Sequence, residues 1–181
     1  MNRPGFPVGL ITRGTIAILL LMGPWASGQD VTEPALKAAF IYSFAKFTEW
    51  PADVVPRAAE PFVMCVLGDT AVGNALERLV KGRVLAGHSM AVSQVTPAGP
   101  QSTCHVLYLS GVTASQAAQL VARHRDVPVL TISDVEGFTN VGGIAQFFFE
   151  QGQLRFTIHV ESAKRAHLQI SSNLLALAKR K

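Results

Sequence analysis

The side chains best placed to bind a ligand follow apolar runs that are expected to be strands. Asp69 comes directly after the run 62–67, and a Ser-Asp pair follows the run 128–132. If these strands are parallel, both groups lie at carboxyl ends, where open α/β sheets place their ligand crevice. Asp and Ser after strands also serve as ordinary turn and cap residues, so this second interpretation stays open. The candidate ligand site consists of Asp69, Ser133, Asp134, Gly142 and Gly143.

Motifs of the common catalytic sites are absent from the sequence. The chain contains no GxSxG, no HExxH, no Walker A sequence and no GxGxxG after a strand. Gly142-Gly143 precedes an expected strand rather than a helix, so it favours a turn over a phosphate cradle. The sequence has five histidines, at His88, His105, His124, His159 and His167. Their spacing does not match that of metal ligands. We therefore expect a protein that is not an enzyme and has no metal and no cofactor.

Composition predicts one folded domain. The 181-residue chain is 49% hydrophobic, contains ten phenylalanines and carries a formal net charge of +4. It is long enough to bury a core and too apolar to be disordered. Its lysines and arginines are scattered along the sequence instead of forming a basic patch, so we expect no binding to nucleic acid.

Residues 1–28 have the pattern of a secretory signal peptide. Arg3 and Arg13 precede an apolar run at 16–22, and small residues end the segment. The run is shorter than the roughly 20 residues that span a bilayer, which favours cleavage over a retained N-terminal anchor. We expect a signal peptide at 1–28 and a mature domain at 29–181 in an oxidising compartment.

Export to an oxidising compartment would allow the two cysteines to form a disulfide. Cys65 and Cys104 lie within or at the mouth of the apolar runs 62–67 and 104–109. Adjacent strands could join them in a disulfide that closes a loop of about 40 residues. Two unpaired core cysteines are the alternative, and a zinc site is less favoured because CxxC and HxxxH spacings are absent.

Residues 33–50 favour a helix with an unusually aromatic face. Thr32 is a suitable N-cap, Pro34 fits the first turn and Pro51 ends the pattern. The apolar stripe consists of Leu36, Phe40, Phe44 and Phe47. Core packing is the favoured role for most of these aromatics, whereas Tyr42 and Trp50 are candidates for a partner surface.

Apolar runs bounded by turn residues predict the remaining elements. Expected strands are 62–67, 83–85, 90–95, 104–109 and 128–132, and expected helices are 71–80 and a segment capped by Thr113 that runs to His124. A hairpin joins strands 144–149 and 154–160, and helices follow at 162–168 and after Asn173 as N-cap. The alternation indicates βαβ units. We expect a single α/β domain with a mixed, mostly parallel sheet, a C-terminal antiparallel hairpin and helices packed on both faces.

Five ordered segments of the chain resemble the YfiR family of exported bacterial regulators. They are AAFIYSFAKFTEWP (38–51), CVLGD (65–69), CHVLYL (104–109), LTISD (130–134) continuing through GF (137–138) to GGI (142–144), and ISS (170–172) before LL (174–175). The resemblance extends over essentially the whole mature chain.

The resemblance implies a periplasmic repressor. Such a protein binds the periplasmic sensor domain of an inner-membrane diguanylate cyclase of the YfiN-like type and keeps the cytoplasmic cyclase inactive. Cyclic di-GMP and biofilm formation are then lowered. The resemblance also implies a homodimer and a disulfide between Cys65 and Cys104. Some relatives carry a second cysteine pair that this chain lacks, so redox control through that pair is not implied.

A periplasmic small-ligand-binding domain of unknown ligand is the alternative function. Its crevice would be formed by the candidate ligand site described above. For a protein partner, the candidate surface adds the loop 134–143, which includes Phe138, to Tyr42 and Trp50.

Overall fold

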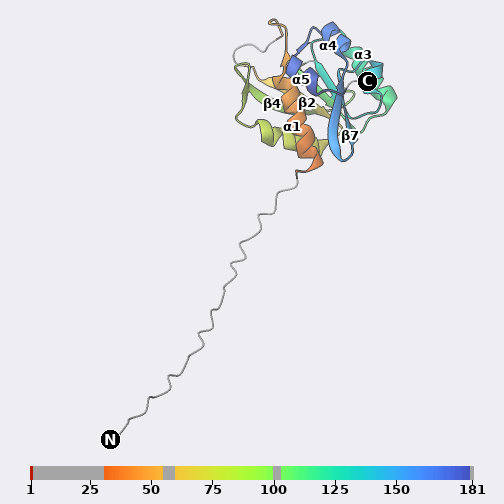
Figure 1. Cartoon of the computed structure of the whole chain (residues 1–181). Helices are drawn as coiled ribbons and strands as arrows, with labels where there is room; N and C mark the ends of the chain where they lie inside the picture. Colours follow the sequence, from red (N-terminus) through yellow and green to blue (C-terminus); the bar gives the residue numbers. More distant parts are fainter. Residues whose placement is uncertain (2–30, 55–59, 100–102, 180–181) are drawn as a thin grey trace. The chain divides into compact units, whose positions relative to one another are not determined.

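A seven-stranded sheet organises the fold (Figure 1). Its strands are β2 (Phe62–Leu67), β3 (Val84–Leu85), β4 (His88–Val95), β5 (Val106–Leu109), β6 (Leu130–Ser133), β7 (Ala145–Glu150) and β8 (Gln153–Ile158). The strand order is β3-β4-β2-β5-β6-β7-β8. The five central strands pair in parallel, whereas β3 with β4 and β7 with β8 pair antiparallel. The predicted α/β class, with its mostly parallel sheet and C-terminal hairpin, is confirmed.

The computed structural model describes residues 1, 31–54, 60–99 and 103–179. From Val31 onward the described residues form one compact unit. The predicted signal peptide at 1–28 lies outside the described residues apart from Met1. None of the helices within the described ranges is both long enough and apolar enough to cross a membrane.

Helices pack on both faces of the sheet, as expected. They are α1 (Glu33–Lys46), α2 (Thr70–Val80), α3 (Ala114–Arg123), α4 (Val160–Arg165), α5 (Ser172–Leu177) and the 3-10 helix η1 (Phe138–Val141). Because side chains alternate along a strand, β2 sends Met64 and Val66 to one face and Cys65 and Leu67 to the other. The first face packs against α1, α2, α4 and α5, and the second against α3 and η1.

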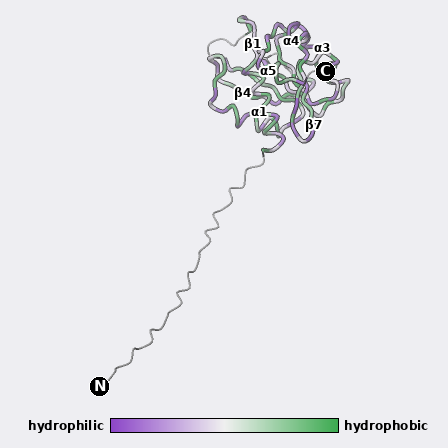
Figure 2. The backbone as a smooth tube through the Cα atoms, in the orientation of Figure 1, coloured by the Kyte–Doolittle hydropathy of each residue, from purple (hydrophilic) through white to green (hydrophobic). Residues whose placement is uncertain are grey.

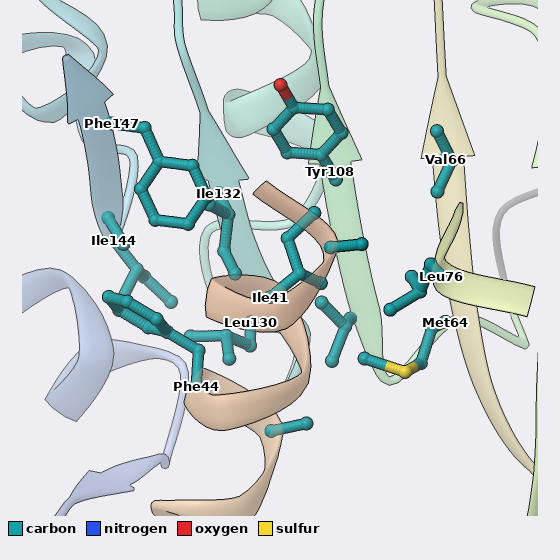
Figure 3. Packing of buried hydrophobic residues seen from close by; sticks show 14 of the residues in the cluster. Ile41, Phe44, Met64, Val66, Leu76, Tyr108, Leu130, Ile132, Ile144 and Phe147 are labelled. Atoms are coloured by element: carbon teal, nitrogen blue, oxygen red, sulfur yellow. The ribbon is translucent and has the colours of Figure 1, made fainter. Parts of the chain in front are cut away.

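The larger core lies between α1 and the sheet. Figure 3 shows Ile41 and Phe44 of α1 facing Leu130 and Ile132 of β6, and all four side chains are fully buried. Phe44 also makes edge-to-face contacts with two rings of the β7–β8 hairpin. Hydrophobic and hydrophilic residues are interleaved along the backbone in Figure 2, as expected where each element buries one side.

The first helix is shorter than predicted. It ends at Lys46, and Thr48–Glu49 forms a short strand, β1, instead of a last helical turn. β1 pairs antiparallel with β9 (Gln169–Ile170), which the sequence analysis did not predict. Thr48 pairs with Ile170, far along the chain, and the hydrogen bonds of this pairing compete with those of the helix. The local sequence pattern alone therefore extends the predicted helix too far.

Cap residues explain the differences in the bounds of the last two helices. Thr113 caps α3 as predicted, through a capping box with Gln116. The predicted Asn173 cap is wrong, because the side chain of Ser171 accepts the hydrogen bond at the start of α5. The helix predicted at 162–168 instead spans Val160–Arg165, because His159 caps it and ends β8 early.

Candidate functional site

A disulfide joins two neighbouring strands of the sheet. Cys65 on β2 and Cys104, two residues before β5, are bonded with their Cα atoms 5.7 Å apart. Both cysteines are buried in the α3 face of the core. Two hydrogen bonds also join Val63 and His105. The Val63 N–H donates to His105 Nδ1 at 3.0 Å, and the His105 N–H donates to the Val63 carbonyl at 2.9 Å. The predicted pairing is confirmed, and the alternative of two free cysteines is wrong.

The carboxyl ends of β2, β5 and β6 bring three polar residues into one row. These strands are adjacent and parallel, so the residues that follow them, Asp69, Ser110 and Asp134, meet at one edge of the sheet. The Asp69 carboxylate accepts the N–H of Val72 at 3.0 Å and caps α2. Asp69 therefore has the cap role that the sequence left open, at the edge where a ligand crevice was expected.

Asp134 is the centre of this edge. Its Oδ2 accepts three hydrogen bonds, from Lys37 Nζ at 2.7 Å, Tyr108 OH at 2.9 Å and Ser110 Oγ at 3.0 Å. Lys37 also forms an ion pair with Glu33 at 2.7 Å, one turn earlier on α1. We call these five residues the Asp134 cluster. Figure 3 shows the Tyr108 hydroxyl pointing away from the apolar core, toward this edge.

Burial sets the protonation of the cluster. Burial raises the pKa of the Tyr108 hydroxyl, and the adjacent Asp134 charge raises it further. Burial alone would lower the pKa of Lys37, but its hydrogen bonds to Asp134 and Glu33 outweigh that effect and the pKa is raised. At neutral pH a charged ammonium and a neutral phenol therefore donate to one carboxylate. The result is a fixed link between the start of α1 and the sheet.

Sequence reasoning missed Lys37 and Tyr108. The available signal was the position of Lys37, which lies four and seven residues before Ile41 and Phe44 on the buried stripe of α1. A charged residue on such a stripe needs a partner. Nothing local identified that partner, because Asp134 is 97 residues away in the chain.

The remaining predicted residues, Ser133 at the end of β6 and Phe138, Gly142 and Gly143 in the loop 134–143, shape the backbone of that loop. Ser133 is fully buried, where its hydroxyl donates to the Leu109 carbonyl at 2.8 Å and accepts the Val135 N–H at 3.0 Å. Phe138 is also fully buried. A side chain at Gly143 would place its Cβ 2.2 Å from the Phe138 ring, so glycine lets the chain pass close to that ring.

Gly142 ends the 3-10 helix of the same loop. Its φ of 101° is in the left-handed region that favours glycine, and its N–H bonds back to the Thr139 carbonyl at 3.3 Å. Within the predicted ligand site, Asp134 is therefore the residue whose side chain accepts hydrogen bonds from several other side chains. The roles of the others in contact with a ligand or partner stay predictions.

Tyr42 and Trp50 are half-buried at the surface of the α1 layer. The Tyr42 ring lies beneath two cations, with Arg83 Cζ at 5.1 Å and Lys46 Nζ at 5.7 Å from its centroid. Trp50 packs edge-to-face on Phe62. Its Nε1 is buried and has no hydrogen-bond partner within the described ranges.

The residue directly after α1, Phe47, is exposed, although the sequence analysis placed it on the apolar stripe of the helix. Phe47 is 41% exposed, and Leu177 of α5, at 74%, lies across a small groove from it. The groove has a volume of about 200 Å³ and is floored by Phe44 and Phe156. We call it the α1–α5 groove. Exposed apolar side chains around a cavity are typical of protein contact surfaces.

The described ranges 31–54, 60–99 and 103–179 contain no group of three or more His, Cys, Asp or Glu side chains that could hold a metal ion.

Comparison with known proteins identifies the family. A sequence model described as YfiR/HmsC-like matches residues 34–179, which cover all the helices and strands that the structure describes except the first residue of α1, Glu33. A search of curated protein sequences found no match to the chain.

Proposed function

The chain belongs to the YfiR/HmsC-like family, and we propose that it is a periplasmic protein that represses an inner-membrane diguanylate cyclase. Membership suggests a periplasmic regulator of such a cyclase, and the family is regulatory and non-catalytic. The family match over residues 34–179 is the observation that carries the proposal. The finer statement, that the protein binds the periplasmic sensor domain of the cyclase and holds the enzyme inactive, is our inference.

Repression of this kind is a shift in a conformational equilibrium. The repressor favours the inactive state of the cyclase only by as much as it binds that state more tightly than the active one. Removal of free repressor then raises cyclic di-GMP and, with it, biofilm formation. The proposal needs no catalytic residue in this chain.

Two features support a location outside the cytoplasm. The Cys65–Cys104 disulfide is of a kind that forms and persists in oxidising compartments. Residues 1–28 have the composition of a signal peptide, and cleavage there, which leaves 29–181 as the mature domain, is part of the proposal. The homodimer implied by the resemblance is also retained as a proposal.

We place the cyclase-binding surface on α1, at the α1–α5 groove. Phe47 and Leu177 expose apolar side chains there, and an aromatic side chain beside a small apolar pocket is a common anchor of protein interfaces. Tyr42 and Trp50 do not line this groove, and they remain separate candidates for a partner surface. The sensor domain of the cyclase is the proposed occupant of the groove.

Capture from membranes tests the partner and the surface together. The tagged, exported protein should retain a membrane protein that has a periplasmic domain and a diguanylate cyclase domain. Phe47→Ser should lose this partner, because it removes an exposed anchor without opening the core. The matched control is Val84→Ser, since Val84 is 62% exposed on the edge strand β3. The proposal would be contradicted if no diguanylate cyclase were retained from cells that export the protein.

A further inference from the structure

A second candidate site lies on the side of the β7–β8 hairpin that faces away from α1. A cleft of about 550 Å³ is bounded by the hairpin, by the loop that contains η1 and by Lys179 near the C-terminus. Phe147 and Phe156 of the hairpin contact α1. Because side chains alternate along strands, the neighbouring Gln146 and Thr157 point to the opposite face.

Gln146 and Thr157 line this cleft, and each has a buried side-chain oxygen atom without a hydrogen-bond partner in the described part of the chain. They are directly opposite each other in the β7–β8 register and are only 7% and 6% exposed. Gln146 Oε1 and Thr157 Oγ1 form no hydrogen bond with any group in the described part of the chain. Buried polar atoms of this kind are rare in native proteins and each calls for an explanation. Two of them side by side on a rigid hairpin form a prepared pair of hydrogen-bonding sites.

The charges around the cleft favour a cation. Two lining carboxylates, Asp134 and Glu136, are accompanied by one lining ammonium, that of Lys179. Lys179 is already paired with Glu150, outside the lining. Asp134 is paired with Lys37, but Glu136 is exposed and forms no salt bridge with any residue that the structure describes. Of the charged groups that line the cleft, Glu136 is therefore the one without a salt bridge in the described part of the chain, and it accompanies two buried oxygen atoms that form no hydrogen bond.

The ligand chemistry follows from this combination. An ammonium group supplies three N–H donors and a positive charge. Two donors suit Gln146 Oε1 and Thr157 Oγ1, and the charge is balanced by Glu136. The Phe148 ring also lines the cleft, but Lys179 Nζ of the protein itself lies 5.9 Å from its centroid, so the proposed ligand contacts are those with Gln146, Thr157 and Glu136.

We propose that the cleft between the β7–β8 hairpin and the η1 loop binds a small molecule that carries an ammonium group, held by Gln146 and Thr157. This site goes beyond the proposed repression of a cyclase, because it gives the protein a small-molecule ligand of its own. It lies on the opposite face of the hairpin from α1, so ligand and protein partner do not compete for the same side chains.

Calorimetric titration of the purified protein tests the site directly. The probes are ethanolamine, putrescine and spermidine, and 1,4-butanediol is the uncharged control for putrescine. We expect saturable binding of at least one amine and none of the diol. Because the readout is binding to the isolated protein, its outcome is independent of whether a cyclase is repressed.

Two near-isosteric variants separate binding from folding. Gln146→Met and Thr157→Val should each weaken amine binding at least about tenfold, since each removes one acceptor. Their unfolding temperatures should equal or exceed that of the wild type, because each also removes an unpaired buried polar atom. Gln119→Met, at an exposed position on α3, should leave binding unchanged.

Three results would overturn the proposal. The first is the absence of saturable binding for all three amines. The second is binding that Gln146→Met and Thr157→Val leave intact. The third is a clear fall in the unfolding temperature of both variants, which would show that these polar atoms serve the fold itself.

Discussion

Asp134 joins the helical layer to the sheet through a single carboxylate oxygen. Lys37 donates a hydrogen bond to this oxygen from α1. Tyr108 donates from β5, and Ser110 donates from the position directly after β5. Truncation of one member of such a network leaves the others buried and unpaired, which costs more than the net worth of one hydrogen bond. The cluster therefore fixes the start of α1, the helix on which we place the cyclase-binding surface.

The cluster predicts how stability depends on alkaline pH. Burial and Asp134 raise the pKa of Tyr108 in the folded protein, and the pKa of Lys37 is raised as well. Above about pH 10 the unfolded chain releases a proton that folded Tyr108 keeps, so the free energy of unfolding should fall as pH rises. Tyr108→Phe should reduce this slope by up to about 1.4 kcal/mol per pH unit, measured by urea unfolding. An unchanged slope in Tyr108→Phe would contradict the assignment.

The disulfide should make a large contribution to stability. Cys65 and Cys104 are 39 positions apart, and closing a loop of that size restricts the unfolded chain by about 4 kcal/mol in the entropic account. Replacing both cysteines with alanine should lower the free energy of unfolding by roughly that amount, measured by chemical denaturation. Reduced wild-type protein is the matched control and should unfold at a similar denaturant concentration. Equal stability of the oxidised and reduced wild type would contradict this prediction.

At the scale of elements, the carboxyl edge depends on a close approach between the ends of β2 and β5. Gly68, directly after β2, has a φ of +89°, and a Cβ there would lie 1.9 Å from the Ser110 carbonyl oxygen. Both the left-handed backbone and the missing side chain are needed for Asp69, Ser110 and Asp134 to line up.

Gly68→Ala should therefore destabilise the protein severely, by more than the roughly 1–3 kcal/mol of backbone strain alone. Gly152 in the hairpin turn is the matched control, since its φ is +75° but no heavy atom lies within 4 Å of its hypothetical Cβ. Gly152→Ala should show strain alone. Thermal unfolding of both variants measures the difference, and equal effects would show that the contact with Ser110 does not matter.

Sequence pattern predicted the elements whose signals are local. The apolar run at 62–67 coincides with β2, and Thr113 caps α3 as expected. The pattern failed where a distant segment decides the outcome, as at Thr48–Glu49, which leaves the helix to pair with β9. The 3-10 helix η1 was also missed, because it forms over the buried ring of Phe138 rather than from a periodic apolar stripe.

The same distinction applies to the candidate site. The rule that parallel strands end at one edge places Asp69 and Asp134 together from the sequence alone. Lys37 and Tyr108 could not be assigned to Asp134 in this way, because each contact depends on the three-dimensional packing of α1 on the sheet. Gln146 and Thr157 escaped notice for a related reason, since a polar residue on a hairpin strand normally faces solvent.

At the scale of the whole molecule, the two proposed surfaces share no lining residue. The α1–α5 groove belongs to the layer that covers one face, whereas the cleft at Gln146 and Thr157 opens on the other. The hairpin β7–β8 contributes side chains to both. A ligand that stiffens the hairpin from one side therefore has a physical route to the other, through packed rings such as Phe147 and Phe156 against α1.

The most direct test of the account is the level of cyclic di-GMP in cells from which the gene has been deleted. Deletion should raise cyclic di-GMP, and complementation with the exported protein should restore the lower level. A version without residues 2–28 should fail to complement, because it would not reach the periplasmic domain of the cyclase. No change in cyclic di-GMP on deletion, in cells that express a diguanylate cyclase with a periplasmic domain and export this protein, would contradict repression.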